Sequence, residues 1–335
     1  MSSRRVIVPT WGGPEVLQIL EEAAPEPRAS QVRLRVHAAG VAFGDVMRRR
    51  GVLAPPWTFT PGYDVVGTIE AVGPGVRDMA VGDRFAAMMP GPGFGGYADR
   101  VCLDTSRLVA VPDGLSDTDA VALGLNYITA YQILNRLSSL VAGQRVLIHG
   151  AAGGVGTAVV DLGQWMGLEM FGTASAPKHA FLESRGCTPI DYRSEDFVDR
   201  IASLTDEGVD LAIDGIGGAH LARSYETLQP EGALVMLGIS GEISKGLGAL
   251  ASTVTQLARL KLRRDARRVE VYRIMGSKHA QPAQCKEDWS TCMALKIQGQ
   301  ISPTIAAEVP LERVAEAHRQ LDNASVIGKI VLTCT

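Results

Sequence analysis

The sequence lacks the features of secreted, membrane-spanning and zinc-knuckle proteins. Its five cysteines include no C-x-x-C pair and are scattered along the chain, at Cys102, Cys187, Cys285, Cys292 and Cys334. This pattern argues against a disulfide framework or a zinc knuckle and suits a reducing cytosol. No apolar stretch approaches the roughly 20 residues of a membrane-spanning helix, and the first residues predict a strand rather than the apolar region of a signal peptide. We therefore expect a cytoplasmic protein that does not associate with membranes.

The chain also lacks an excess of charge of either sign. Its 33 basic and 36 acidic residues give a formal net charge of -3 and a pI near 6.1. Such a balance provides no general attraction to nucleic acid or to anionic membranes. A basic run from Arg259 to Arg268 leaves two interpretations open, a patch for RNA or lipid and a solvated helix face. The acidic balance of the whole chain favours the second interpretation.

The 335 residues suffice for two domains, and the pattern of elements changes near residue 116. Before it, short alternating runs such as Gln31 to His37 and Val65 to Val72 are separated by glycine and proline turns. These runs predict a small barrel or sandwich. Beyond it, Ser116 is a helix N-cap candidate with Asp119 three residues on. Strands and helices then alternate, which predicts a parallel sheet with helices on both faces.

The boundaries of individual elements follow from hydrophobic periodicity and from turn residues. We expect strands at 97–101, 108–111, 145–149, 170–173, 189–192, 209–214, 233–237, 269–274 and 328–332. We expect helices at 154–167, 178–185, 197–204, 249–268 and 311–321.

A glycine-rich turn between a strand and a helix is the sharpest local signal. The apolar run from Val146 leads into a turn whose cofactor-facing residues we predict to be Ala152, Gly153, Gly154, Val155 and Gly156. Glycines let the backbone approach a pyrophosphate, and the following helix offers N–H groups and a positive dipole end. Ala151 replaces the first glycine of the usual G-x-G-x-x-G pattern. The alternative is a merely tight strand–helix turn.

The end of the next predicted strand indicates which dinucleotide binds. NAD sites usually carry an acidic residue there, which holds the ribose 2′-hydroxyl. This chain has none and instead offers Ser175 and Lys178, a hydroxyl and a cation suited to a 2′-phosphate. The pattern predicts NADPH, although Lys178 could also be a solvated surface lysine.

Six motifs in order resemble the medium-chain dehydrogenase/reductase family, in its zinc-free quinone oxidoreductase (zeta-crystallin-like) branch. They lie at 38–45, 61–67, 72–76, 81–84, 151–156 and 326–331. The resemblance implies an α/β protein with a GroES-like β-barrel catalytic domain, formed by residues 1–122 and 273–335. A Rossmann NADPH-binding domain, residues 123–272, is inserted between them. It also implies a homodimer, whose edge strand would be 269–274.

The resemblance also implies that zinc is absent. Zinc-dependent relatives have metal ligands at the positions that Ala42 and Tyr63 occupy here, and neither residue is a plausible ligand. The six histidines show no metal-like pairing with a carboxylate or cysteine in the sequence: His37, His149, His179, His220, His279 and His318. We therefore expect no metal site.

Further cofactor contacts are implied by matching motifs. Asn126 and Thr129 match the nicotinamide-side helix of the family, and Tyr192 matches a tyrosine near the 2′-phosphate. The segment Gly238, Ile239 and Ser240 would line the nicotinamide, and Lys329 would reach the cofactor from the tail. Each of these residues could equally be a packing residue.

The resemblance also bears on the proton donor and the substrate pocket. Related quinone reductases have an Asn where this chain has Ala42, and related enoyl reductases tend to have a Tyr in the loop near Leu53. This chain therefore lacks the usual hydrogen-bond and proton donors of both groups. We suggest Tyr63 as the proton donor, with a packed aromatic as the alternative. Asp45 and Asp64 lie in the same motifs, where holding local backbone is the simpler role. The candidate substrate-pocket residues are Phe43, Asp45, Trp57, Phe59 and Phe94, with core packing as the alternative for the aromatic ones.

Together these inferences predict a hydride transfer from NADPH to a conjugated carbonyl of a small molecule. A quinone is favoured, because its reduction leaves a delocalised anion that needs little electrophilic help. One alternative is an enoyl or alkenal reductase of an acyl or biosynthetic intermediate. Another is a non-catalytic NADPH-binding protein with the same fold.

Overall fold

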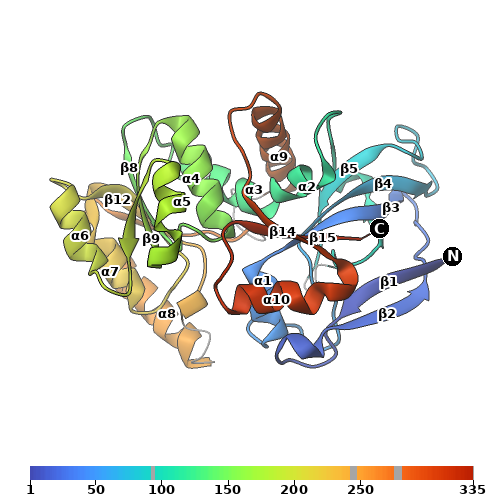
Figure 1. The fold of residues 1–335 in the computed structure, drawn as a ribbon, viewed down its shortest axis with the longest axis horizontal. Helices are drawn as coiled ribbons and strands as arrows, with labels where there is room; N and C mark the ends of the chain where they lie inside the picture. The colour runs from blue at the N-terminus through green and yellow to red at the C-terminus, as the bar shows by residue number, and fades with distance from the viewer. Residues whose placement is uncertain (92–94, 242–246, 275–280, 335) are drawn as a thin grey trace. The chain divides into compact units, whose positions relative to one another are not determined.

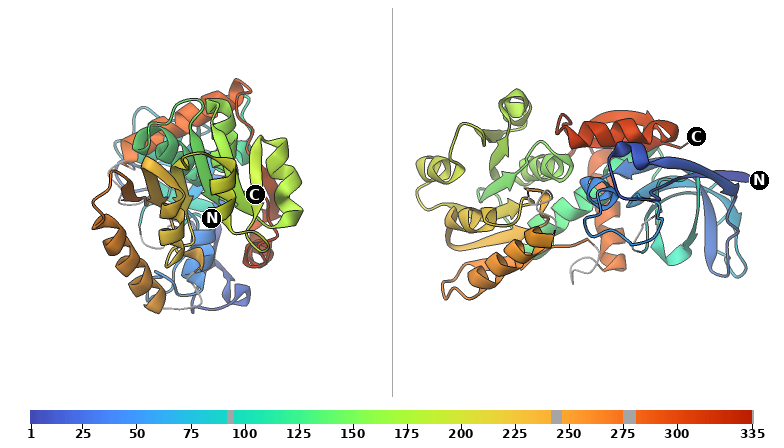
Figure 2. Two further views of the ribbon diagram at one scale, coloured as in Figure 1. Left: turned by 90° about the vertical axis from the view of Figure 1, so that its left-hand side faces the viewer. Right: turned by 90° about the horizontal axis from the view of Figure 1, so that it is seen from below.

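The computed structural model describes residues 1–91, 95–241, 247–274 and 281–334. The chain forms two compact units, Met1–Ile128 with Pro282–Thr335, and Thr129–Gln281. We call them the GroES-like unit and the Rossmann unit. The sequence analysis placed the boundaries at 122/123 and 272/273. In the structure the first boundary lies slightly later, within helix α3 (Leu125–Tyr131), and the second lies between residues 281 and 282. Both termini lie on the GroES-like unit (Figure 2).

The GroES-like unit is built on a seven-stranded sheet in which β3 is the central strand. The strand order is β14-β15-β3-β4-β5-β7, and β6 also pairs with β3. Pairing is antiparallel except between β14 and β15. A separate antiparallel pair consists of β1 (Ser2–Ile7) and β2 (Gln18–Ala23). The sheet strands are β3 (Gln31–Val41), β4 (Asp64–Val72), β5 (Arg84–Met88), β6 (Arg100–Asp104), β7 (Leu108–Ala110), β14 (Ile305–Pro310) and β15 (Lys329–Thr333).

The helices of this unit include two, α1 (Phe43–Arg49) and α9 (Pro282–Ile297), that the sequence pattern did not reveal. The unit also contains α2 (Asp117–Ala122) and α10 (Val314–Asp322). The predicted N-cap of α2 is confirmed, since Ser116 Oγ accepts the Asp119 N–H at 3.0 Å. Helix α9 was missed because its buried residues, such as Trp289 and Cys292, are set among many polar ones. The indole of Trp289 donates to the Ala120 carbonyl at 2.9 Å and so ties α9 to α2.

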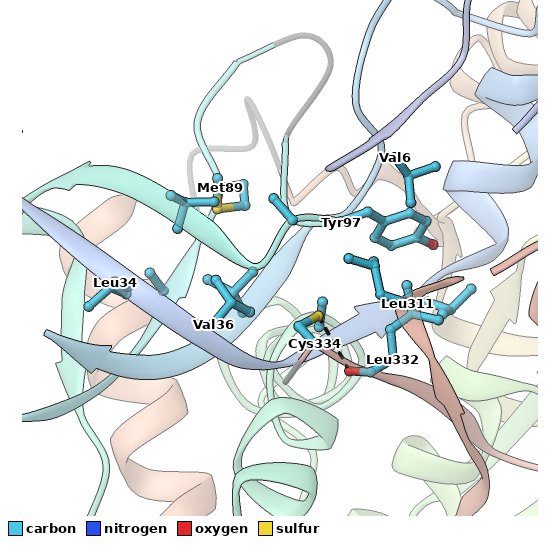
Figure 3. Close-up of a cluster of buried hydrophobic side chains, with 14 of the residues drawn as sticks. Val6, Leu34, Val36, Met89, Tyr97, Leu311, Leu332 and Cys334 are labelled. Atoms are coloured by element: carbon cyan, nitrogen blue, oxygen red, sulfur yellow. Dashed lines mark hydrogen bonds between the residues drawn. The ribbon is translucent and has the colours of Figure 1, made fainter. Parts of the chain in front are cut away.

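The core of the GroES-like unit joins the N-terminal strands to the C-terminal tail. Figure 3 shows Leu34 and Val36 of β3 in one buried cluster with Leu332 of β15, Tyr97 and Leu311. All five side chains are nearly or fully buried, and each buried side chain of this size contributes roughly 1.5–3 kcal/mol. This packing explains why the chain returns to its first unit after the Rossmann unit.

The Rossmann unit is a parallel six-stranded sheet in the order β10-β9-β8-β11-β12-β13. The order reverses between β8 and β11, which is where doubly wound folds bind ligands. Helices α4 and α5 cover one face, and α6 and α7 cover the other (Figure 1). The strands are β8 (Arg145–His149), β9 (Glu169–Ala174), β10 (Cys187–Asp191), β11 (Val209–Asp214), β12 (Leu228–Met236) and β13 (Arg268–Val271). The helices are α4 (Gly154–Met166), α5 (His179–Ser184), α6 (Phe197–Leu204), α7 (His220–Glu226) and α8 (Leu247–Lys261).

Most predicted elements agree with the observed ones within a few residues, and three do not. The strand expected to start at residue 233 begins earlier, at Leu228. The strand expected from Tyr97 begins only at Arg100, because the buried Tyr97 side chain turns toward Asp45. The helix expected to reach Arg268 ends at Lys261. Beyond it the chain folds over the Tyr225 ring, which has the Arg263 and Arg267 guanidinium carbons 5.0 and 5.3 Å from its centroid.

Two further observations bear on association with other molecules. The basic run lies mostly exposed at and beyond the end of α8, where Asp265 pairs with Arg263. Across 1–91, 95–241, 247–274 and 281–334, no helix combines the length and the apolar character that a bilayer span requires. The candidate pocket residue Phe94 and the histidine His279 lie outside the described residues.

Candidate functional site

The glycine-rich turn joins β8 to α4 as the sequence predicts. Gly150 has a positive φ of 69°, a conformation that costs other residues energy. A Cβ on Gly156 would lie 2.3 Å from the Gly150 carbonyl oxygen, so only glycine lets the start of α4 approach the turn. Helix α4 has Gly153 as its N-cap, with no side-chain cap and no acidic residue in its first turn. The positive end of the helix dipole is therefore not countered locally and fits an anionic group such as a pyrophosphate.

The residues predicted to bind a 2′-phosphate lie at the carboxyl ends of β9 and β10. Ala174, the last residue of β9, is the register partner of Asp191, the last residue of β10. Ser175 and Lys178 follow β9 and are half-buried, and burial lowers the pKa of Lys178. Tyr192 follows β10 with 54% of its surface exposed. The two strand ends thus bring a hydroxyl, a cation and an exposed aromatic ring to one edge of the sheet.

Arg193 adds a second cation at this edge that the sequence reasoning did not single out. Its guanidinium carbon lies 5.7 Å from the centroid of the Tyr192 ring. The Asp191 carboxylate accepts the Arg193 backbone N–H at 3.0 Å and so shapes its own turn. The nearest signal in the sequence was the position of Arg193 directly after Tyr192.

The loop after β12 lies against the loop after β11. Ser240 donates to the Gly215 carbonyl through both its N–H and its hydroxyl, each at 2.8 Å. Ile239 is buried, and a Cβ on Gly217 would meet it at 3.1 Å. A Cβ on Gly238 would likewise lie 3.1 Å from the Gly215 oxygen. The predicted segment Gly238 to Ser240 therefore forms one side of the carboxyl edge of the sheet.

In the GroES-like unit, Asp45 forms the centre of a fully buried polar cluster. Its carboxylate accepts the N–H groups of Ala42 at 3.0 Å and Gly62 at 2.9 Å, and the hydroxyl of Tyr97 at 3.0 Å. Burial raises the pKa of Asp45 to about 6, although these hydrogen bonds and the Lys329 charge oppose the rise. Tyr97 also lies 3.3 Å from His318, which extends the cluster to α10. Asp45 thus holds the backbone on both sides of the first motif.

Tyr63 lies beside this cluster with its hydroxyl over α1. A Cβ on Gly44 would lie 2.3 Å from Tyr63 Oη, so the glycine makes room for the phenol. Burial raises the pKa of Tyr63 to about 12, and the charge of Asp45 adds to the rise, whereas a hydrogen bond from Arg48 opposes it. The phenol is therefore protonated at neutral pH and can act as a proton donor. Arg48 was not identified from the sequence, since α1 itself was not predicted.

Lys329 and Asp64 form a buried ion pair in the same unit. Lys329 Nζ lies 3.5 Å from Asp64 Oδ2, and the two side chains are 3% and 0% exposed. Within the described residues, neither Lys329 Nζ nor Asp64 Oδ1 has a hydrogen-bond partner. Buried ammonium groups are normally satisfied, so this one fits an additional anionic oxygen, such as one of a dinucleotide.

Asp64 also fixes the start of α3, which carries two predicted cofactor contacts. Asp64 Oδ2 accepts the Leu125 N–H at 2.8 Å. Asn126 and Thr129 follow on this helix and are each 5% exposed. Asp64 therefore connects the motif of Tyr63 to the helix of Asn126.

The candidate pocket-wall residues do not form one cluster. Phe59 is buried, whereas Phe43 and Trp57 are 38% and 59% exposed. Trp57 and Phe59 line a shallow depression with Arg5 and Glu22, and neither Phe43 nor Asp45 is among its lining residues. Trp57 and Phe59 therefore occupy a different place on the GroES-like unit from Phe43 and Asp45.

A group of histidines and a carboxylate comes together in the Rossmann unit, which the sequence did not anticipate. His149, Asp214 and His220 have ligand-type atoms that all lie within 4.8 Å of one another. His149 ends β8 and Asp214 ends the neighbouring β11. The expectation that no histidine pairs with a carboxylate is wrong at this place.

Two family models match the chain. One describes the alcohol dehydrogenase GroES-like domain and matches residues 28–113, and the other describes a zinc-binding dehydrogenase and matches residues 187–332. Among curated relatives, the human synaptic vesicle membrane protein VAT-1 homolog is 36% identical over 94% of this chain and 82% of its own length. The quinone oxidoreductase of Rattus norvegicus is 30% identical over 98% of this chain and 97% of its own.

Solved structures agree with these matches. The quinone oxidoreductase of Coxiella burnetii superposes with a TM-score of 0.84 at 25% identity, over all of both chains. The CurK enoyl reductase gives 0.83 at 26% identity, over 99% of each chain. Mycobacterial Rv1454c, solved with NADPH, gives 0.82 at 25% identity, over 98% of this chain and 99% of its own.

These findings agree with the fold, a GroES-like unit together with a Rossmann unit. The cofactor class they support is a nicotinamide dinucleotide. The chain belongs to the medium-chain dehydrogenase/reductase superfamily of oxidoreductases, in its zinc-independent, quinone oxidoreductase-like branch.

Proposed function

We propose that this oxidoreductase is a cytoplasmic, NADPH-dependent enzyme that reduces a conjugated carbonyl, with a quinone as the favoured acceptor. The observation that carries the cofactor choice is the end of β9, where Ser175 and Lys178 stand and a carboxylate is missing. A ribose 2′-phosphate gains from a cation and a hydroxyl at this point, whereas NADH offers only a neutral hydroxyl.

Different residues of the chain would bind different parts of NADPH. The turn from Ala152 to Gly156 would hold the pyrophosphate, and Ser175, Lys178 and Tyr192 would hold the adenosine phosphate. Asn126, Thr129, Gly238, Ile239 and Lys329 would contact the remainder of the cofactor. When bound, NADPH supplies the hydride.

The chemistry left to the protein is the handling of the anion formed on the acceptor. Hydride addition to a conjugated carbonyl leaves an enolate or a hydroquinone anion, which hydrogen-bond donors stabilise. Tyr63 is the proposed donor, because its phenol stays protonated at neutral pH and a hydrogen bond from Arg48 stabilises its anion. A quinone suits this modest donor best, since its anion is already delocalised.

An enoyl or alkenal reductase is the second candidate. The similarity to the CurK enoyl reductase favours it, and the same residues would bind NADPH. Its less stabilised enolate would depend more strongly on Tyr63 than a hydroquinone anion does.

The edge strand β13 supports the proposal of a homodimer. It pairs only with β12 among the described strands and stands at one edge of the Rossmann sheet. Unpaired edges expose backbone hydrogen-bonding groups, and pairing with a second copy satisfies them.

The test is NADPH oxidation with a small panel of acceptors: benzoquinone, phenanthrenequinone, hexenal and crotonyl-CoA. We expect turnover of the quinones with NADPH well above NADH. Turnover confined to hexenal or crotonyl-CoA would establish the second candidate instead. NADPH binding without oxidation of any acceptor would favour a non-catalytic protein of this fold, and absence of NADPH binding would refute the proposal.

A further inference from the structure

A chain of hydrogen bonds connects the glycine turn to the ends of three neighbouring strands. It starts at Gly150, the first residue of the turn, whose N–H donates to Thr173 Oγ1 at 3.2 Å. Thr173 Oγ1 lies 3.2 Å from Nδ1 of His149. Thr173 is the penultimate residue of β9 and His149 is the last residue of β8. Both side chains are buried, with 3% and 8% of their surface exposed.

The series of hydrogen bonds continues from His149 to β11. Nε2 of His149 lies 3.1 Å from Ser224 Oγ, and Ser224 Oγ donates to Asp214 Oδ2 at 2.7 Å. The Ser224 hydroxyl has two acceptors, Asp214 Oδ2 at 2.7 Å and the His220 carbonyl oxygen at 3.2 Å, and the closer, charged one takes its proton. The Ser224 oxygen then accepts from Nε2 of His149. Nδ1 of His149 is then unprotonated and accepts from Thr173. Burial lowers the pKa of His149 to about 3, which keeps the imidazole in this neutral form.

Asp214 holds the far end of this series of hydrogen bonds. Its Oδ1 accepts the N–H groups of Ile216 at 2.8 Å and Gly217 at 3.0 Å, and its Oδ2 lies 2.8 Å from Nδ1 of His220. These bonds shape the loop after β11, against which Ile239 packs. The donors and acceptors along the chain are thus matched from Gly150 to Gly217.

A metal centre is the other arrangement that these residue types can form. His149, Asp214 and His220 are zinc-type ligands. The hydroxyl of Ser224, however, lies among their ligand atoms, at 3.1 Å from His149, 2.7 Å from Asp214 and 3.3 Å from His220. Each ligand atom already has a hydrogen bond, so the geometry favours a polar network over a metal centre.

We propose that Thr173 and His149 are positioning residues that hold Gly150, and with it the glycine turn, in the geometry that receives the dinucleotide. The inference rests on the proposed NADPH binding and adds the residues that prepare the turn for it. Thr173 acts through the Gly150 N–H, and His149 orients the Thr173 hydroxyl. Ser224 and Asp214 fix the tautomer of His149. A preformed turn binds the cofactor without an ordering cost.

The test compares two buried threonines of the Rossmann unit. Thr205 also accepts a glycine N–H, that of Gly208 at 3.1 Å, but it lies before β11 at the amino end of the sheet. Thr173→Val removes the hydroxyl with little change of shape, Thr173→Ser keeps it, and Thr205→Val is the matched control. We expect Thr173→Val to raise the Kd for NADPH about tenfold, because the Gly150 N–H loses the acceptor that orients it. Thr173→Ser and Thr205→Val should remain within about twofold of wild type.

Amide hydrogen exchange of the cofactor-free protein separates this inference from the proposed function. Thr173→Val should speed the exchange of Gly150 and leave Gly208 protected, and Thr205→Val should do the reverse. If wild type fails to bind NADPH, the proposed function fails while the exchange still decides whether Thr173 holds the turn. Unchanged Gly150 exchange together with an unchanged Kd in Thr173→Val would overturn the inference. So would a thermal stabilisation of EDTA-treated wild type by Zn²⁺ that His220→Asn abolishes, since it would establish a metal centre.

Discussion

Two buried carboxylates, one in each unit, respond to burial in opposite ways. Asp45 and Asp214 are both 0% exposed, and each accepts two backbone N–H groups. Burial raises the pKa of Asp45 to about 6. Burial also raises that of Asp214, but the hydrogen bond from His220, the histidine charges and the Ser224 hydroxyl outweigh it and lower the pKa to about 2.

The difference shows that the side-chain donors decide the charge, since the backbone donors are alike. Asp45 has one side-chain donor, the phenol of Tyr97, whereas Asp214 has a hydroxyl and an imidazole. Asp214 is therefore ionised at neutral pH. Asp45 lies close to protonation at neutral pH, beside the candidate donor Tyr63.

The largest expected effect is that of Asp214→Asn. The amide places an NH₂ group against the donors of Ser224 and His220, and we expect a loss of about 3–5 kcal/mol of unfolding free energy, as for a broken buried charge network. Asp45→Asn at pH 7 should cost less, because a charge that burial opposes is removed as well. Urea denaturation of both variants measures the two costs. Equal costs would show that the side-chain donors do not distinguish the two sites.

The pH dependence of stability should separate the two carboxylates next. The folded protein binds the Asp45 proton more tightly than the unfolded chain, so this group stabilises the fold at low pH. That contribution is lost as pH rises from its ordinary value of 3.8 through about 6, and two pKa units correspond to about 3 kcal/mol. The contribution of Asp214 runs the other way: it is present above pH 3.8 and is lost as pH falls toward 2.

Denaturation of wild type and Asp45→Asn from pH 4 to pH 7 isolates the first contribution. Wild type should be relatively most stable at the acid end and lose that advantage as pH rises. A difference between the two proteins that does not vary with pH would contradict the raised pKa.

The sequence predicted the Rossmann unit more completely than the GroES-like unit, for a physical reason. Apolar runs bounded by glycines predicted strands ending at His149, Thr173 and Asp214, which are the residues that the network joins. Neighbouring parallel strands end at the same edge, so the network could have been suspected from these endings. Its details could not, because they depend on strand register and on a tautomer.

The surroundings of Tyr63 depended on features that the sequence pattern hid. The contact of Arg48 with Tyr63 requires helix α1, which is short and carries no clear apolar period. The pair of Lys329 with Asp64 joins residues from opposite ends of the chain. The resemblance to a family supplied Tyr63 and Lys329 as candidates, and only the structure shows their partners.

Tyr63→Phe extends the comparison from the carboxylates to the phenol near Asp45. If Tyr63 supplies the proton, the variant should lose about a hundredfold in kcat, a typical contribution of general acid catalysis. Tyr225→Phe is the matched control, because this phenol is also buried, donates to Asp265 and has its pKa raised to about 12 by burial. Steady-state turnover with a quinone measures both. Unchanged turnover in Tyr63→Phe would leave Tyr63 as a packing residue.

The smallest expected effect concerns a charge that is only half-buried. Lys178 is half-buried, and solvent weakens the interaction between a charge near the surface and a bound phosphate. Lys178→Ala should therefore raise the KM for NADPH by about tenfold and leave stability nearly unchanged. The KM for NADH should not move, since NADH has no 2′-phosphate to lose a partner. Lys261→Ala, an exposed lysine of the same unit, controls for a general effect of charge on anion binding. A parallel rise for both dinucleotides would mean that Lys178 supports the fold of the edge rather than reading the phosphate.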